Sequence, residues 1–209
     1  MKAVAQLLNE MLKEGIIGNY ALFGAVAQMR YTEPIATLDA DVLVSLTSPD
    51  RLDVLEEIYR FCETKGYRTA GEAVQVGAWP VQFIPVFSAL TREALEQAET
   101  ADFEGVPFRV VRADYLAVIA LSVRRPKDLT RILALLESGT VRAEGIAALA
   151  SRHGLSGEWD CFVSKFLNDR HPPAPGASSA VAEKPPGTVM AGEDSHGSEY
   201  PRLGGGVSL

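Results

Sequence analysis

The stretch FGAVAQMRYTEPIATLDADVLVSL, residues 23–46, decides the predicted fold. An apolar run ends at Gly24, a short helix is predicted over 25–31, and Asp39 and Asp41 stand at the mouth of an otherwise apolar strand. In a strand, residues two apart lie on the same face, so both carboxylates are expected to point the same way. Such a pair repels itself and loses hydration unless a positive charge lies between its members. A divalent cation meets that need, and Mg²⁺ suits carboxylate, water and phosphate oxygens.

The glycine turn in the same stretch predicts a second half of one site. Gly24 lets backbone N–H groups approach an anion closely, and a helix beginning at Ala25 directs the positive end of its dipole to the same place. A phosphate-binding turn followed by a metal-binding carboxylate pair suits a nucleoside triphosphate. The alternative is that Asp39 ends a turn and Asp41 faces solvent.

The bulk composition indicates a soluble globular protein. The chain has 209 residues, 47% of them hydrophobic and 22% charged, with a formal net charge of −7. This balance provides no global basic field for nucleic-acid binding. No apolar run reaches the roughly 18 residues of a membrane span, and the N-terminus is typical of an amphipathic helix rather than a signal peptide. Cys62 and Cys161 form no metal-binding pattern, which predicts buried free thiols in a reducing cytoplasm.

The rest of the chain predicts a mixed pattern of helices and strands. The expected elements are a helix over 2–14 with Val4, Leu7, Leu8, Met11 and Leu12 inward, a strand over 20–23, a strand over 42–46, a helix from Ser48-Pro49-Asp50 to Gly66, strands 74–76 and 81–86 turning at Gly77-Ala78, a loop or helix over 88–98, a hairpin of 101–103 and 108–111 around Glu104-Gly105, and helices near 113–123, 126–137, 142–152 and 157–168.

This pattern predicts an α+β or α/β fold, with a short mixed sheet, flanking helices and a C-terminal helical portion. We expect a first domain over 1–112 and a helical portion over 113–170 packed on it. Residues 171–209 are rich in proline and poor in large apolar side chains, so a disordered tail is expected there.

The quoted motif resembles the signature of the minimal nucleotidyltransferases of the DNA polymerase β superfamily. Gly24-Ala25 is followed by thirteen residues and then by Asp39-Ala40-Asp41 with apolar flanks. The wider run YALFGAVAQMRYTEPIATLDADVLV is similar to small bacterial members, including AbiEii/AbiGii-type toxin nucleotidyltransferases. A second stretch, LSVRRPKDLTRILALL (121–136), resembles their downstream helical motif. The resemblance covers roughly residues 1–140.

The resemblance implies a fold, a reaction and a set of site residues. The fold is a nucleotidyltransferase-like mixed sheet followed by helices, and the reaction transfers a nucleoside monophosphate from an NTP to an acceptor hydroxyl. Gly24 and Ala25 would bind triphosphate oxygens, and Asp39 and Asp41 would be the catalytic ligands of Mg²⁺. Lys127 and Asp128 would lie at the cleft edge, with Lys127 offsetting phosphate charge and Asp128 fixing its neighbours. The residues alone are equally consistent with a polar turn between two helices at 124–128.

Three positions depart from the family pattern. Ala25 replaces the usual Gly or Ser, and no basic residue follows Pro34, although Arg30 is a candidate substitute. A third carboxylate, expected on a later strand, is replaced by Gln82, which is neither a base nor a good Mg²⁺ ligand. Glu72 precedes the neighbouring strand and is a candidate to reach across to the site; the alternative is that it is a surface glutamate in a loop.

These departures leave three hypotheses. The chain is an active nucleotidyltransferase, a catalytically weak or inactive binding module with that fold, or an unrelated α+β domain. RNA, a protein or a small molecule all remain open as the acceptor. The resemblance to toxin-type members implies an antitoxin-like partner protein, and no membrane partner is expected.

Overall fold

The computed structural model describes residues 1–46 and 55–168. All of them lie within one structural unit, Met1–Pro172, and the second unit, Pro173–Leu209, lies outside the described residues. The elements are α1 (Lys2–Lys13), β1 (Ile17–Phe23), α2 (Gly24–Gln28), β2 (Ala40–Leu46), α3 (Glu56–Thr64), β3 (Arg68–Ala70), β4 (Ala73–Val76), β5 (Trp79–Pro85), α4 (Ala89–Glu96), β6 (Glu99–Phe103), β7 (Val106–Val110), α5 (Ala113–Val123), α6 (Pro126–Glu137), α7 (Ala143–Arg152) and α8 (Ser156–Phe166).

The strands of the described chain form one mixed seven-stranded sheet in the order β3-β4-β5-β2-β1-β7-β6. The central strand β2 runs antiparallel to β1 and parallel to β5. Its register pairs Asp41 with Phe23 on one side and with Gln82 on the other. The sheet therefore brings the glycine turn, the carboxylate and the glutamine of the sequence argument to the same end of three adjacent strands.

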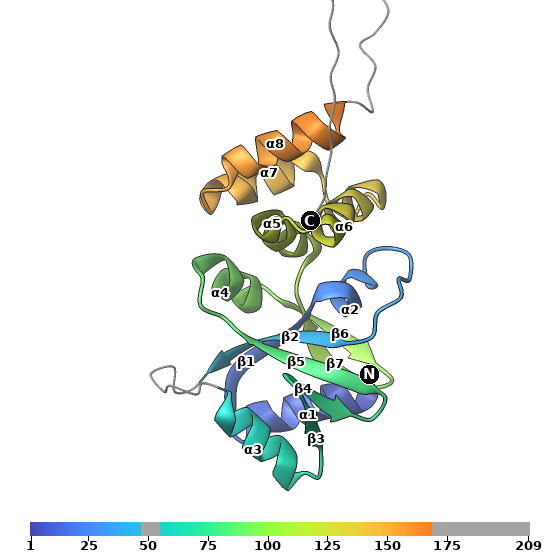
Figure 1. The fold of residues 1–209 in the computed structure, drawn as a ribbon, viewed down its shortest axis with the longest axis vertical. Coiled ribbons are helices and arrows are strands. Elements are labelled where there is room, and N and C mark those ends of the chain that lie inside the picture. Colours follow the sequence, from blue (N-terminus) through green and yellow to red (C-terminus); the bar gives the residue numbers. More distant parts are fainter. Residues whose placement is uncertain (47–54, 169–209) are drawn as a thin grey trace, which may run out of the picture. The chain divides into compact units, whose positions relative to one another are not determined.

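Helices cover the sheet in layers (Figure 1). Helices α1 and α3 lie on one side, and α2 and α4 lie on the other, where α2 contacts β1 and β2. Helices α5–α8 stack beyond α2 and α4, and α5 contacts α2, α4 and the other three C-terminal helices. The predicted mixed sheet with flanking helices is confirmed.

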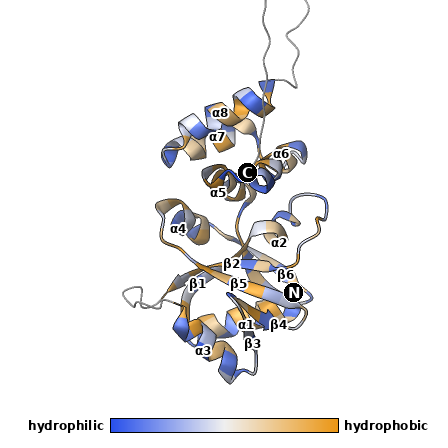
Figure 2. Cartoon of the chain, in the orientation of Figure 1, coloured by the Kyte–Doolittle hydropathy of each residue, from blue (hydrophilic) through white to orange (hydrophobic). Residues whose placement is uncertain are grey.

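Apolar side chains from both parts of the fold join one hydrophobic cluster. Helix α5 is apolar along nearly its whole length, as its colour in Figure 2 shows, and Ala113 and residues 115–121 are buried. A helix that is apolar all round is typical of a position inside the core. It forms the centre about which α4, α6, α7 and α8 pack.

The turn residues predicted both hairpins. In the β6–β7 turn, Glu104 and Gly105 both have positive φ, 51° and 79°, as a tight two-residue turn requires. The β4–β5 turn lies at Gly77 and Ala78, as predicted. The helix expected to begin at Ser48-Pro49-Asp50 is described only from Glu56, because that start lies outside the described residues.

Four details of the sequence prediction were wrong. Leu12, expected in the core, is 39% exposed, since it lies at the margin of the apolar face of α1. Cys62 is buried, but Cys161 is exposed on the outer face of α8. The helix after the glycine turn ends at Gln28, earlier than predicted. The short strand β3 was missed because all three of its residues are exposed and show no apolar alternation.

Candidate functional site

The glycine turn and the second aspartate of the motif are in direct contact. Gly24 follows the last residue of β1 and has φ +64°, a left-handed backbone conformation that residues other than glycine rarely adopt. A Cβ atom placed on Gly24 would lie 2.1 Å from Oδ2 of Asp41 and 3.0 Å from its Cγ. The carboxyl group of Asp41 therefore occupies the space that any other residue at position 24 would need.

The first aspartate lies just outside the strand. Asp39 precedes β2, and its Oδ1 and backbone oxygen both accept from Oγ1 of Thr37, each at 3.2 Å. Asp39 and Asp41 are both half-buried. Burial raises the pKa of Asp41, and the negative charge of Asp39 raises that pKa further. Both causes disfavour the ionised carboxylate, and a bound cation would relieve them.

The beginning of α6 supplies positive charge to the same site. Arg131, Lys127 and Arg125 oppose the increase in the pKa of Asp41 through their electrostatic interaction with it. These cations follow the glycine turn by about a hundred residues, and the packing of α5 against α2 and α6 brings them near it. The structure thus places the two sequence motifs, 24–41 and 124–128, within electrostatic reach of each other.

Asp128 lies inside the protein rather than at the predicted cleft edge. Its side chain is 1% exposed. Its Oδ2 accepts from Nε of Arg125 at 2.6 Å and from the Arg125 backbone N–H at 3.3 Å, and its Oδ1 accepts from Nη1 of Arg131 at 3.3 Å. The carboxylate therefore holds two arginines and the first turn of α6, and its burial corrects the expectation that it faces the cleft.

Sequence reasoning missed Arg131 and Gln28. Arg131 Nε donates to Oε1 of Gln28 at 3.0 Å, which links α6 to α2. The only sequence signal for Arg131 was its position three residues after Asp128, on the same side of the helix. Gln28 gave no signal, because a single polar residue at the end of a short helix is ordinarily solvated.

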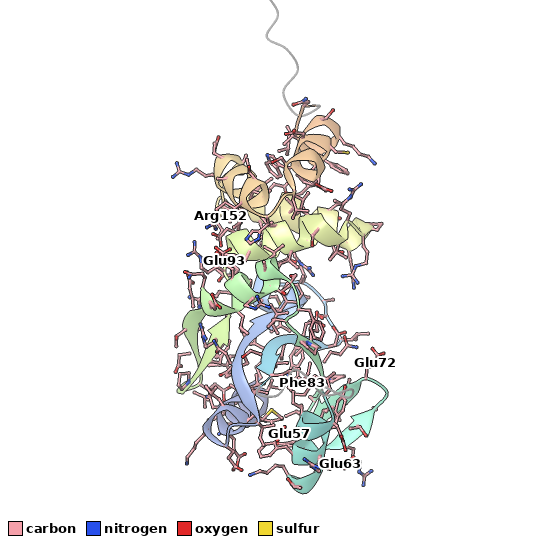
Figure 3. The ribbon with its side chains drawn as sticks, turned by 90° about the vertical axis from the view of Figure 1, so that its left-hand side faces the viewer. Glu57, Glu63, Glu72, Phe83, Glu93 and Arg152 are labelled. Atoms are coloured by element: carbon pink, nitrogen blue, oxygen red, sulfur yellow. The ribbon has the colours of Figure 1, made fainter. Side chains whose placement is uncertain are left out.

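The position of the expected third carboxylate is occupied by Gln82. This residue is the direct neighbour of Asp41 on the parallel strand β5. Glu72 is exposed at the β3–β4 turn, by the outer edge of the sheet (Figure 3), where its backbone oxygen accepts from the Tyr59 hydroxyl. Within residues 1–46 and 55–168, no cluster of three or more His, Cys, Asp or Glu side chains is placed to hold a metal ion.

The two aspartates could hold a magnesium ion only if other ligands completed its coordination shell. Asp39 and Asp41 supply hard carboxylate oxygens, and Mg²⁺ characteristically takes one or two carboxylates while phosphate oxygens and water complete its shell. Ala25 carries no side-chain hydroxyl, so only backbone donors at the turn could contact an anion. Arg30, the candidate substitute cation, lies 3.7 Å from Glu99 in an ion pair.

A separate polar cluster connects α4 to the C-terminal helices. Oε1 of Glu93 accepts from the Tyr115 hydroxyl at 2.7 Å and lies 2.9 Å from Nη2 of Arg152. His153, which caps the end of α7, places Nε2 2.7 Å from Oε2 of the same glutamate. Figure 3 shows Glu93 and Arg152 side by side between the two parts of the fold. This cluster holds α4 against α5 and α7. It lies on different elements from Asp39 and Asp41.

No protein-family model and no curated protein matches the sequence. Solved structures with some likeness include the antibiotic-resistance factor ANT(2'')-Ia in solution (TM-score 0.47, 13% identity, 81% of this chain and 98% of that chain). ANT(2'')-Ia in complex with adenylyl-2''-tobramycin has a TM-score of 0.47 and 15% identity, over 78% of this chain and 97% of that chain. An antigenic nucleotidyltransferase-like protein from Paracoccidioides brasiliensis has a TM-score of 0.44 and 14% identity, over 76% and 91%. At these values the likeness carries no functional argument. In the described part of the chain, no helix is long and apolar enough to cross a membrane.

Proposed function

We propose that the chain is a nucleotidyltransferase-like protein that transfers a nucleoside monophosphate from a Mg²⁺-bound nucleoside triphosphate to an acceptor hydroxyl. One observation carries the proposal: the carboxylate of Asp41 lies directly against Gly24, and the negative charge of Asp39 acts on that carboxylate. Backbone N–H groups at a glycine turn and a carboxylate pair at the same strand end would form the two halves of a triphosphate–metal site.

Each predicted site residue receives a role in this proposal. Asp39 and Asp41 hold the ion, which when bound would polarise the α-phosphate and orient the leaving group. Backbone N–H groups at Gly24 and Ala25 bind phosphate oxygens. Lys127 offsets the negative charge of the triphosphate, and Asp128 holds α6 in position.

The reaction requires one proton to leave the acceptor. The acceptor oxygen attacks the α-phosphorus, the bond from that phosphorus to the bridging oxygen of the β-phosphate breaks, and pyrophosphate departs with the electron pair. Gln82 cannot accept the hydroxyl proton, so the proton passes to water or to one of the two aspartates. Because a well-placed general base contributes about 10²–10⁴-fold, transfer is expected to be slow.

A second candidate function has its own supporting observation. Gln82 lies beside Asp41, and the described residues contain no three-acid cluster, which favours a binding module that holds a Mg²⁺–nucleotide without transferring it. The first proposal admits RNA, a protein or a small molecule as the acceptor, and an antitoxin-like protein as a partner. The net charge of −7 disfavours a long nucleic-acid acceptor.

A transfer assay separates the two candidates. The protein is incubated with each labelled NTP, Mg²⁺ and cell extract, and Asp39→Asn/Asp41→Asn is compared with Glu63→Gln/Asp160→Asn, which removes two exposed charges elsewhere. The enzyme hypothesis is supported if the wild type and the control double variant transfer the label and the Asp39→Asn/Asp41→Asn variant does not. Mg²⁺-dependent nucleotide binding without transfer supports the binding module, and neither activity contradicts both.

The variant Gln82→Asp provides a gain-of-function test. It places a carboxylate beside Asp41, and for an enzyme limited by the missing base the transfer rate should increase by about 10²-fold or more. An unchanged rate in a folded Gln82→Asp variant would show that proton removal from the acceptor does not limit the reaction.

A further inference from the structure

A single arginine binds the buried polar side chains of the described chain. Within residues 1–46 and 55–168, the buried polar or charged residues are Gln28, 4% exposed, and Asp128, 1% exposed. Arg131 donates to both, to Oε1 of Gln28 at 3.0 Å and to Oδ1 of Asp128 at 3.3 Å. Its own side chain is only 10% exposed.

Such a network is stable only when each member has a partner. A buried carboxylate left alone is costly, and Asp128 avoids that cost by bonding to Arg125 and Arg131 together. Breaking one hydrogen bond to a charged group costs more than breaking a neutral bond, because the remaining partner stays desolvated. The geometry at Arg131 is therefore strongly favoured over alternatives in which the guanidinium turns outward.

The network joins the two halves of the candidate site. Gln28 is the last residue of α2, the helix that begins at Gly24, and its backbone oxygen accepts from the amides of Tyr31 and Thr32. At the other end, Arg131 lies one turn after Lys127, and residues four apart share a face of a helix. The same guanidinium that holds the end of α2 therefore sets where Lys127 lies.

We propose that Arg131 is a positioning residue for the nucleotide site: held by Gln28 and Asp128, it fixes the first turn of α6 against α2, so that Lys127 faces the phosphates bound at the glycine turn. This inference rests on the proposed function and names the contacts that fix the position of α6 relative to the glycine turn. Arg131 acts through Lys127 and does not itself contact the substrate.

The coupling of α2 to α6 is tested first without any nucleotide. Gln28→Met removes the acceptor while keeping a side chain of similar length, and Arg131→Lys keeps the charge. Amide hydrogen exchange at Tyr31 and Thr32 should become roughly 10-fold faster or more in Gln28→Met, from the loss of a charged hydrogen bond. Arg152→Met, which breaks the ion pair between Arg152 of α7 and Glu93 of α4, should leave the exchange of these amides unchanged. Unchanged exchange in Gln28→Met would overturn the proposal.

The effect on the phosphate site is tested by a double-mutant cycle. Arg131→Met and Lys127→Met should each weaken Mg²⁺–ATP binding about 10-fold, and the double variant should bind little worse than either single variant, because one residue acts through the other. Arg131→Lys should restore part of the affinity, and the affinity of AMP should change much less than that of ATP. Fully additive losses, or equal losses for AMP and ATP, would show a merely structural role. Absence of nucleotide binding by the wild type would contradict the proposed function and with it the positioning role at a nucleotide site, while hydrogen exchange still reports whether the two helices are coupled.

Discussion

Substituting Gly24 by alanine is expected to destabilise the protein far more than an ordinary glycine substitution in a turn. The change has two costs. A left-handed backbone at φ +64° costs a side chain roughly 1–2 kcal/mol. The new Cβ would also lie 2.1 Å from Oδ2 of Asp41, against about 3.4 Å for an ordinary contact, so the carboxylate has to retreat by about 1.3 Å. Overpacking of this kind costs roughly 1–3 kcal/mol, which brings the total to about 2–5 kcal/mol.

A matched glycine isolates the contact from the backbone strain. Gly71 has the same φ of +64°, and a Cβ placed there meets nothing within 4 Å. In urea denaturation followed by circular dichroism, Gly71→Ala should therefore lower the free energy of unfolding only by the cost of the left-handed backbone. Gly24→Ala should lose more by about 1–3 kcal/mol, and in an Asp41→Ala background that excess should largely disappear. Equal losses at Gly24 and Gly71, or an excess that survives removal of Asp41, would refute the packing of the carboxylate on the glycine.

Three further predictions concern charge and exposure. Burial and the charge of Asp39 raise the pKa of Asp41 above its unfolded value of about 3.8. The stability that protonated Asp41 contributes is therefore present below pH 3.8 and is lost as the pH rises through the higher pKa of the folded state. Without Mg²⁺, Asp41→Asn should therefore increase the free energy of unfolding at pH 7 and not near pH 3; equal effects at both pH values would contradict this. The hydrogen bond from Tyr115 and the charge of Arg152 lower the pKa of Glu93, so the stability that ionised Glu93 contributes is present above pH 4.5 and is lost as the pH falls through the lower pKa of the folded state. Glu93→Gln should therefore flatten the dependence of unfolding free energy on pH in that range. An unaltered pH dependence would argue against the Glu93 cluster. With a thiol reagent in the folded state, Cys161 should react and Cys62 should not, because burial raises the pKa of Cys62 to about 12; similar rates would contradict the burial.

The elements that the sequence predicted well are those with strong local signals. The hairpin at Glu104-Gly105 follows from turn chemistry, and the helices from 113 onward follow from apolar periodicity and from Pro126 at a helix start. The strand β3 has neither signal. Its three exposed residues are paired only because the hairpin β4–β5 presents an edge to them.

The candidate site divides in the same way. The D-x-D spacing and the glycine are local features, and together they predicted that Gly24 and Asp41 lie in one site. The Arg131–Gln28 bond joins residues 103 positions apart, and it depends on how α5 carries α6 back onto α2. Asp128 was expected at the cleft edge because of the family resemblance. Its two arginine partners are local, three residues before and three residues after it, but its burial depends on tertiary packing that the sequence does not show.

The central claim is that Gly24, Asp39 and Asp41 form one metal–triphosphate site. Its most direct test is anomalous scattering from crystals grown with Mn²⁺ and a triphosphate that cannot be cleaved between its α- and β-phosphates. The proposal predicts a metal peak about 2.0–2.3 Å from carboxylate oxygens of both aspartates, with phosphate oxygens at the backbone of the glycine turn. A nucleotide bound elsewhere, or a metal peak that neither aspartate reaches, would contradict it.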